Sequence, residues 1–286
     1  MIYLLLSILF STLTVTYFKI FELKKVQTFQ AIIVNYITCG VIGTSFSERA
    51  IWHPEVYSSP ILLYTFILGF LFISIFYCIA LTAQKISVSA SMVAAKLSVV
   101  VPVVLAWLLY QEHITWMQIV GILLSLAAVY FISRKEQSIH QKGWVLLLLP
   151  ALVFMGSGSI DSLLNYLEKT FVPAFSADEI VTCTFIFAFL LGLTFFVYRS
   201  QKGADKFELK SVYWGIALGI PNYFSMYFLV KTLGSFPATF IFPINNIGIV
   251  VMSTLIAFLF FKEHLSKINM LGMALAFIAI LLISLS

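Results

Sequence analysis

The sequence predicts an all-α integral membrane protein, and three observations lead to this fold class. Hydrophobic residues make up 61% of the 286 residues and charged residues only 10%, against roughly 45–50% and about 25% in soluble domains. The apolar residues fall into ten runs, each close to the roughly 20 residues that cross a bilayer. The chain also repeats itself, because similar motifs recur 150 to 151 residues apart.

The ten runs are expected to be ten transmembrane helices joined by short connections, none long enough for a domain outside the membrane. The first run lacks the basic start and the cleavage site of a signal peptide, so it is interpreted as a membrane helix. The expected spans are 2–20, 28–46, 60–82, 87–110, 115–132, 144–166, 178–198, 211–231, 236–260 and 268–285.

Lysine and arginine are unevenly distributed among the connections. Of the 17 such residues, 13 lie in the connections after the odd-numbered spans, and the alternate connections hold only Arg49, Lys169 and Lys231. Cytoplasmic loops carry the excess of these residues. We therefore expect a cytoplasmic (inner) membrane protein with both termini outside. The net charge of +5 is explained by the lysines and arginines of these loops, so it does not indicate a nucleic-acid partner.

The repeat divides the chain into two related halves, expected at residues 1–135 and 142–286. Each half holds five spans, an odd number, so the halves have opposite orientations in the membrane. Inverted repeats are a common plan of transporters, which bind substrate near the midplane between the halves. The matched features are the turns Tyr110–His113 and Phe261–His264, the pairs Glu112/Glu263 and Gly121/Gly272 at an offset of 151, and Gly69/Gly219, Tyr77/Tyr227 and Thr82/Thr232 at an offset of 150.

Ten spans, two inverted halves and a (Tyr/Phe)-x-Glu-His turn before a glycine-bearing fifth helix resemble the drug/metabolite transporter superfamily, and within it the EamA-like transporters. The resemblance covers nearly the whole chain. It implies a central cavity lined by spans three, four, eight and nine, with contributions from spans one and six, and a peripheral scaffold of spans five and ten. It is specific for fold and not for substrate, because the family carries amino acids, nucleotide sugars, drugs and other metabolites. Many members are described with cytoplasmic termini, so the charge count departs from that pattern.

Lys96 is the most unusual residue of the spans, because a lysine at the bilayer centre costs about 2.5–3.5 kcal/mol. It is expected to face a polar site, although it could instead be a structural lysine tied to carbonyls or a carboxylate. Asn222, Asn245 and Asn246 are expected at a similar depth, although not at positions matched to Lys96 in the repeat. An ammonium group with amides suits an anionic or zwitterionic solute. The alternative for each asparagine is a hydrogen bond that only ties two helices together.

Aromatic side chains complete the expected substrate site. Tyr77, Tyr223 and Tyr227 could supply its walls, as ligand sites usually require, or they could be ordinary core or interface aromatics. Close helix packing is expected at three patterns of small residues, namely Gly215-xxx-Gly219, Gly121-xxx-Ser125 and Gly272-xxx-Ala276.

Asp161 is the other charge inside a span, expected nearer the outer face. It is the candidate for proton coupling or for an ion pair with Lys96, and the alternative is an interfacial carboxylate. Pro102 and Pro243 each free a backbone carbonyl and permit a kink in corresponding spans, which suits a gate, and the alternative is a static kink. Glu112 and Glu263, at the turns, are expected to be helix-start or interface residues.

Catalytic, metal and cofactor sites are not expected. The three cysteines are far apart, no CxxC occurs, and the four histidines lie in expected loops without zinc spacing, so each is interpreted as a solvated residue. A membrane hydrolase would need a Ser–His, paired-Asp or zinc site within the spans.

The sequence therefore predicts a secondary active transporter that exports a small polar metabolite, one bearing a carboxylate such as an amino acid, by alternating access. The direction of transport follows from the resemblance. The alternative is a lipid or carrier-lipid flippase of the same fold. The expected partners are a small-molecule substrate, protons and the lipid bilayer, and the expected oligomeric state is a monomer or weak homodimer.

Overall fold

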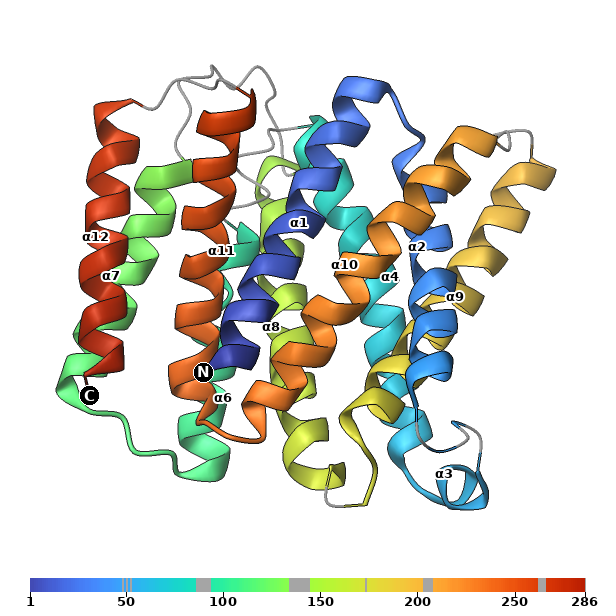
Figure 1. Cartoon of the computed structure of the whole chain (residues 1–286), viewed down its shortest axis with the longest axis horizontal. Coiled ribbons are helices and arrows are strands. Elements are labelled where there is room, and N and C mark those ends of the chain that lie inside the picture. Colours follow the sequence, from blue (N-terminus) through green and yellow to red (C-terminus); the bar gives the residue numbers. More distant parts are fainter. Residues whose placement is uncertain are drawn as a thin grey trace. The chain divides into compact units, whose positions relative to one another are not determined.

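The computed structural model describes residues 1–47, 49, 51, 53–85, 94–133, 145–172, 174–202, 208–261 and 266–285. Helices are the only regular elements in these ranges, which confirms the all-α class (Figure 1). The helices are α1 Ile2–Lys24, α2 Thr28–Phe46, α3 Pro54–Ser58, α4 Ile61–Lys85, α6 Val100–Tyr110, α7 Trp116–Ser133, α8 Val145–Phe171, α9 Ala177–Gln201, α10 Leu209–Leu233, α11 Ala238–Phe261 and α12 Lys267–Ser284.

Each expected span contains helical residues, although positions 87–93 of the span expected at 87–110 lie outside the described residues. The short helix α3 lies within an expected connection. Six helices of the described residues are long and apolar enough to cross a membrane: Ile2–Phe21, Thr28–Phe46, Ile61–Ile79, Leu148–Phe171, Ala177–Gln201 and Ala238–Phe260. Three shorter apolar helices are Ala94–Tyr110, Trp116–Phe131 and Lys267–Ile283. The 25-residue α10 falls in neither group. The chain is thus a multi-pass membrane protein, and the count of ten spans stays a prediction.

The chain forms two compact units, and each of them combines segments from both expected halves. Unit 1 comprises Met1–Ser74 and Tyr166–Gly234, and unit 2 comprises Ile75–Asn165 and Ser235–Ser286. Helices α4 and α8 begin in one unit and end in the other. Unit 1 therefore contains α1, α2, α3, α9 and α10, and unit 2 contains α6, α7, α11 and α12.

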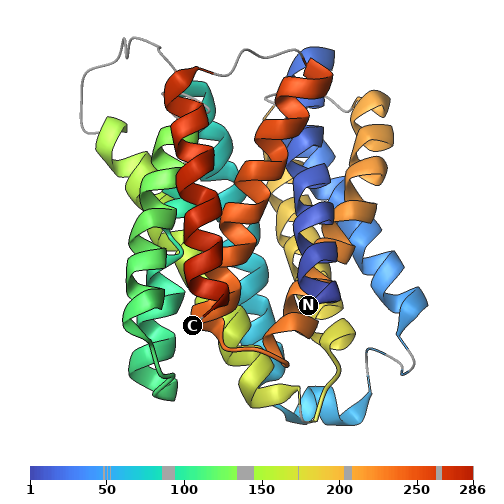
Figure 2. The same ribbon diagram turned by 60° about the vertical axis from the view of Figure 1, so that its left-hand side comes forward.

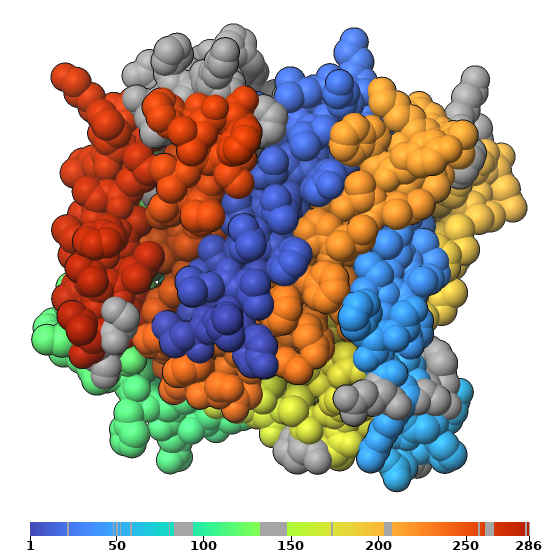
Figure 3. Space-filling model, in the orientation of Figure 1, coloured from blue at the N-terminus to red at the C-terminus, as the bar shows by residue number. Residues whose placement is uncertain are grey.

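In unit 1, α10 packs against α1 and α2, and α2 also packs against α9. Figure 3 shows α1 and α10 side by side across one face. Close approach to α2 occurs at the predicted glycine pair. A Cβ atom on Gly215 would lie 2.6 Å from the carbonyl oxygen of Ala31, and one on Gly219 would lie 3.0 Å from that of Asn35. Real Cβ contacts are rarely so short, so this interface requires glycine at both positions.

In unit 2, α7 and α12 lie side by side (Figure 2), and α11 packs against α6, α7 and α12. Gly121 of α7 forms the close contact, because its Cβ would lie 2.6 Å from Ile283 Cγ1. The second predicted small-residue pattern is therefore also at a helix interface. The core of this unit consists of Ala128, Val129, Ile247, Val250, Ala276 and Ala279.

Candidate functional site

The helix that carries Lys96 is interrupted immediately after it. Residues 94–97 are helical, Ser98 and Val99 form a turn, and α6 begins at Val100. Pro102 explains the interruption, because proline has no N–H to donate to the carbonyl four residues earlier, which is that of Ser98. That carbonyl instead accepts a 2.9 Å hydrogen bond from the Val101 N–H. The expected kink at Pro102 thus takes the form of a local break, whereas Pro243 lies inside α11 without one.

Lys96 is partly buried, and its ammonium group points at α11. Lys96 Nζ donates a 3.0 Å hydrogen bond to Asn246 Oδ1. Asn246 and its neighbour Asn245 are both buried, at 7% and 6% exposure. Because the acceptor is a neutral amide, the hydrogen bond leaves the positive charge of Lys96 uncompensated.

Asp161 supplies an opposite charge from α8, and it interacts electrostatically with Lys96. The two helices meet one turn before it, since a Cβ atom on Gly158 would lie 3.1 Å from the carbonyl oxygen of Ser98. Helix α8 extends to Phe171, five residues beyond its expected end. Asp161 therefore lies ten residues before the last residue of α8.

Asn165 follows Asp161 by one turn of α8 and is only 2% exposed. Its Oδ1 atom accepts no hydrogen bond from any group that the structure describes. A buried acceptor without a donor costs about 1–3 kcal/mol. Asn165 was not among the predicted site residues, although an asparagine in the same span as Asp161 is a signal visible in the sequence.

Asn222 lies in unit 1, where it forms a polar link between α10 and α2. Its Nδ2 atom donates to Asn35 Oδ1 at 3.1 Å, and the Cys39 thiol donates to the Gly219 carbonyl oxygen at 3.3 Å. Asn35 is 1% exposed and was not considered in the sequence analysis. The structure gives Asn222 the contact of a helix-tying residue, so its substrate contact stays a prediction.

The three tyrosines are divided between the units. Tyr223 and Tyr227 lie one turn apart on α10, with their rings stacked at 5.9 Å between centroids. Tyr223 is 1% exposed, and Lys231 Nζ lies 4.7 Å from the centroid of the Tyr227 ring. Tyr77 belongs to the part of α4 in unit 2 and is partly buried. Within unit 2 the predicted residues are Lys96, Asn245, Asn246, Asp161 and Tyr77, together with Pro102 and Pro243.

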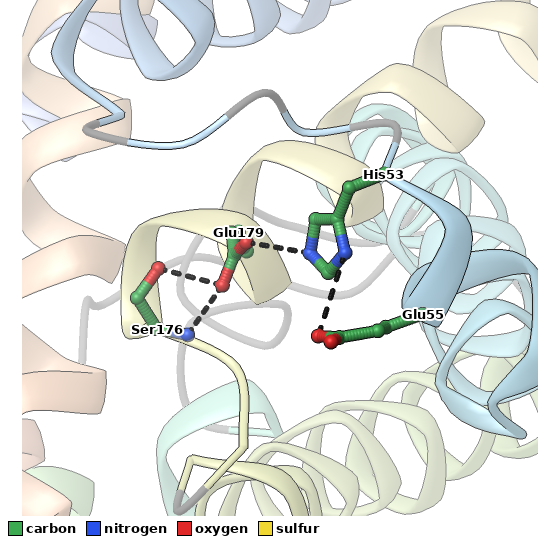
Figure 4. Close-up of polar contacts among 4 residues, drawn as sticks. All are labelled: His53, Glu55, Ser176 and Glu179. Atoms are coloured by element: carbon green, nitrogen blue, oxygen red, sulfur yellow. Dashed lines mark hydrogen bonds and ion pairs between the residues drawn. The ribbon is translucent and has the colours of Figure 1, made fainter.

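A second polar cluster lies at the start of α9 in unit 1 (Figure 4). His53 Nε2 lies 3.0 Å from Glu179 Oε1, and Nδ1 lies 3.7 Å from Glu55 Oε2. Glu179 Oε2 accepts hydrogen bonds from the Ser176 N–H and hydroxyl at 2.6 and 2.9 Å, which forms a capping box. The interpretation of His53 as a solvated loop residue was wrong. Its side chain is 16% exposed, because it pairs with a buried carboxylate and stacks on Phe175.

Glu112, in the turn before α7, caps another helix. Its carboxylate accepts hydrogen bonds from the N–H groups of Ala238 and Thr239, at 3.3 and 3.1 Å, at the start of α11. Free N–H groups at a helix N-terminus are satisfied best by such acceptors. The expected helix-start role is confirmed for Glu112. Its counterpart Glu263 lies outside the described residues, as do His140 and His264.

The described ranges contain no group of three or more His, Cys, Asp or Glu side chains that could hold a metal ion. Cys39, Cys78 and Cys183 are all free thiols.

The profile of the EamA-like transporter family matches residues 1–134 and again residues 142–285. This chain belongs to the EamA-like transporter family. The two matches cover nearly the whole chain, which confirms the resemblance seen in the turn motifs. The EamA-like family is part of the drug/metabolite transporter superfamily, so this protein is a membrane transporter.

Relatives of this EamA-like protein extend over its full length. An uncharacterized protein of Haemophilus influenzae is 29% identical over 293 residues, which cover 97% of this chain and 95% of the relative. One crystal structure of a protein has a TM-score of 0.77 over 99% of this chain and 96% of its own, at 13% sequence identity. At that identity, the structural likeness shows the fold alone.

Proposed function

We propose that this EamA-like transporter moves a small polar metabolite bearing a carboxylate, and that Lys96 binds that carboxylate. The observation that carries the proposal is the hydrogen bond from Lys96 to Asn246, whose amide is neutral. A charge placed inside a membrane helix is expensive and therefore marks a functional site by default. Because Asn246 satisfies one donor of an ammonium group that has three, Lys96 keeps donors and net charge for an anionic group.

The proposed mechanism is alternating access between two inverted halves. The two family matches support this repeat, and so do the contacts of the paired glycines. Gly69 of α4 faces Ala188 of α9, whereas Gly219 of α10 faces Thr38 of α2. The two contact partners, Thr38 and Ala188, are also 150 residues apart in the sequence, as a repeat would place them. The break before Pro102 gives the Lys96 helix a point at which it could bend, and Pro243 is its proposed counterpart in α11.

The proposed function also includes proton coupling and a topology in the membrane. Asp161 is the candidate for proton coupling because it interacts with the proposed substrate-binding lysine. The distribution of lysine and arginine supports a location in the inner membrane with both termini outside. Export is the proposed direction, and Asn245, Tyr77 and the α10 residues Asn222, Tyr223 and Tyr227 are proposed as further substrate contacts.

The test is uptake of labelled metabolites into proteoliposomes that contain the full chain. We expect transport of at least one carboxylate, and its loss in Lys96→Ala. Lys169→Ala is the control, because Lys169 lies in the last turn of α8, eight residues beyond Asp161, and its loss should leave transport unchanged. Absence of transport of every carboxylate by the wild-type protein would overturn the proposal. Movement of a labelled lipid in the same vesicles would support the flippase alternative.

A further inference from the structure

One face of α8 points toward the broken helix that carries Lys96. Gly158 contacts Ser98 and Val101 at that break. Asp161 and Asn165 follow Gly158 by three and seven residues, and residues at these spacings share one face of an α-helix. Both residues belong to unit 2, as do Lys96 and Asn246. The electrostatic interaction between Asp161 and Lys96 agrees with this placement.

Asp161 and Asn165 present hydrogen-bond acceptors one helical turn apart. The Asp161 carboxylate has the charge of Lys96 near it. Asn165 Oδ1 is buried and receives no hydrogen bond from any group in the described residues. Buried polar atoms in folded proteins are nearly always satisfied by protein, water or ligand. An unsatisfied buried acceptor one helical turn from a carboxylate therefore indicates a ligand group with several donors.

An ammonium group has this chemistry, because it offers three N–H donors and a positive charge. A carboxylate ligand would be repelled by Asp161 and would find no donor at Asn165 Oδ1. We propose that Asp161 and Asn165 form an ammonium-binding subsite, so that the site takes zwitterionic solutes. The solute's carboxylate then lies at Lys96 and its ammonium group at Asp161. This inference rests on the proposed function, and it assigns Asp161 to substrate recognition.

The subsite predicts discrimination between solutes that differ only in one donor group. The probes are L-amino acids, each paired with the 2-hydroxy acid of the same side chain, and binding is measured by thermal stabilisation of the purified full chain. We expect the amino acid to bind about tenfold or more tightly than its hydroxy acid, because sites that bind a donor reject analogues lacking it. Asp161→Asn and Asn165→Ala should remove this preference and leave the weaker binding of the hydroxy acid unchanged.

Ser162→Ala is the matched control on the same helix. The Ser162 hydroxyl donates to the Gly158 carbonyl oxygen within α8, so its loss should leave the preference intact. Equal affinity of amino and hydroxy acids for the wild-type protein would overturn the subsite while the proposed function stands. If no carboxylate binds at all, the proposed function fails as well. Should Asp161→Asn fail to fold, the wild-type comparison and Asn165→Ala still decide the question.

Discussion

Lys96 Nζ and Asn246 Oδ1 lie 3.0 Å apart, although 150 residues separate them in the chain. The same offset relates Gly69 to Gly219. At an offset of 150, Lys96 and Asn246 would be equivalent positions of the proposed repeat. Residues related by a two-fold axis contact each other only beside that axis. The proposed inverted repeat would thus place its axis at this hydrogen bond, where a substrate could contact both halves.

Replacement of Asn246 by alanine should lower the free energy of unfolding by about 1.5–3 kcal/mol, because the ammonium group of Lys96 loses its acceptor. Thermal unfolding of the purified protein measures the effect. In a double-mutant cycle with Lys96→Ala, the coupling between the two sites should be about 1 kcal/mol or more. Strictly additive single effects would contradict an energetic contribution from this hydrogen bond.

Gly219→Ala should destabilise unit 1 by about 1–3 kcal/mol through overpacking. The new Cβ would lie 2.5 Å from Thr38 Cβ, and neither backbone can move without opening the interface between α10 and α2. Gly40→Ala is the control, because its Cβ would meet only the flexible Ile186 side chain, at 3.1 Å. Equal melting temperatures for the two variants would show that the glycine contact is not tight.

Pro102→Ala should restore a continuous helix over 94–110, because alanine supplies an N–H that can donate to the Ser98 carbonyl four residues earlier, as in a regular α-helix. We expect the variant to be at least as stable as the wild type, while transport in proteoliposomes slows several-fold. Pro150→Ala serves as the comparison, since α8 accommodates Pro150 within an unbroken helix. Wild-type transport by Pro102→Ala would show that the break has no part in gating.

Glu179→Ala should cost about 1–2 kcal/mol, because it removes the capping box of α9 and the buried partner of His53. Hydrogen exchange should rise at the start of α9 and around His53. Glu55→Ala tests the other carboxylate near the same ring. The Glu55 side chain is 74% exposed, so its loss should change stability by less than about 0.5 kcal/mol. Comparable destabilisation by both variants would contradict the dominant role of Glu179.

Apolar runs predicted the helices well, because membrane-spanning length is a strong physical constraint. The ends of the helices were predicted less accurately than their positions in the chain. Glu168 and Lys169 indicated that the sixth span stopped before them, yet α8 continues to Phe171 because Leu167 and Phe171 are buried in unit 1. The polarity of a sequence does not show that the charged end of a helix packs against other helices in the fold.

The candidate site was predictable in part. The cost of burying a charge singled out Lys96, and the repeat brought Asn246 to its depth. Asn35 and Asn165 were missed, because a single asparagine in an apolar run carries little energetic signal until its partner, or its lack of one, is seen. The pairing of His53 with Glu179 joins segments 126 residues apart, and no local pattern encodes such a contact.

The composition of the two units has a consequence for how the protein is made. Helix α1 packs against α10, and α2 packs against α9 and α10. Helix α6 packs against α11, and α7 packs against α11 and α12. When the ribosome has inserted residues 1–133, these helices lack the partners synthesised later. At that stage Asn35 and Lys96 lack their hydrogen-bond partners, Asn222 and Asn246. The first half therefore spends part of synthesis with polar side chains whose partners have not yet been made.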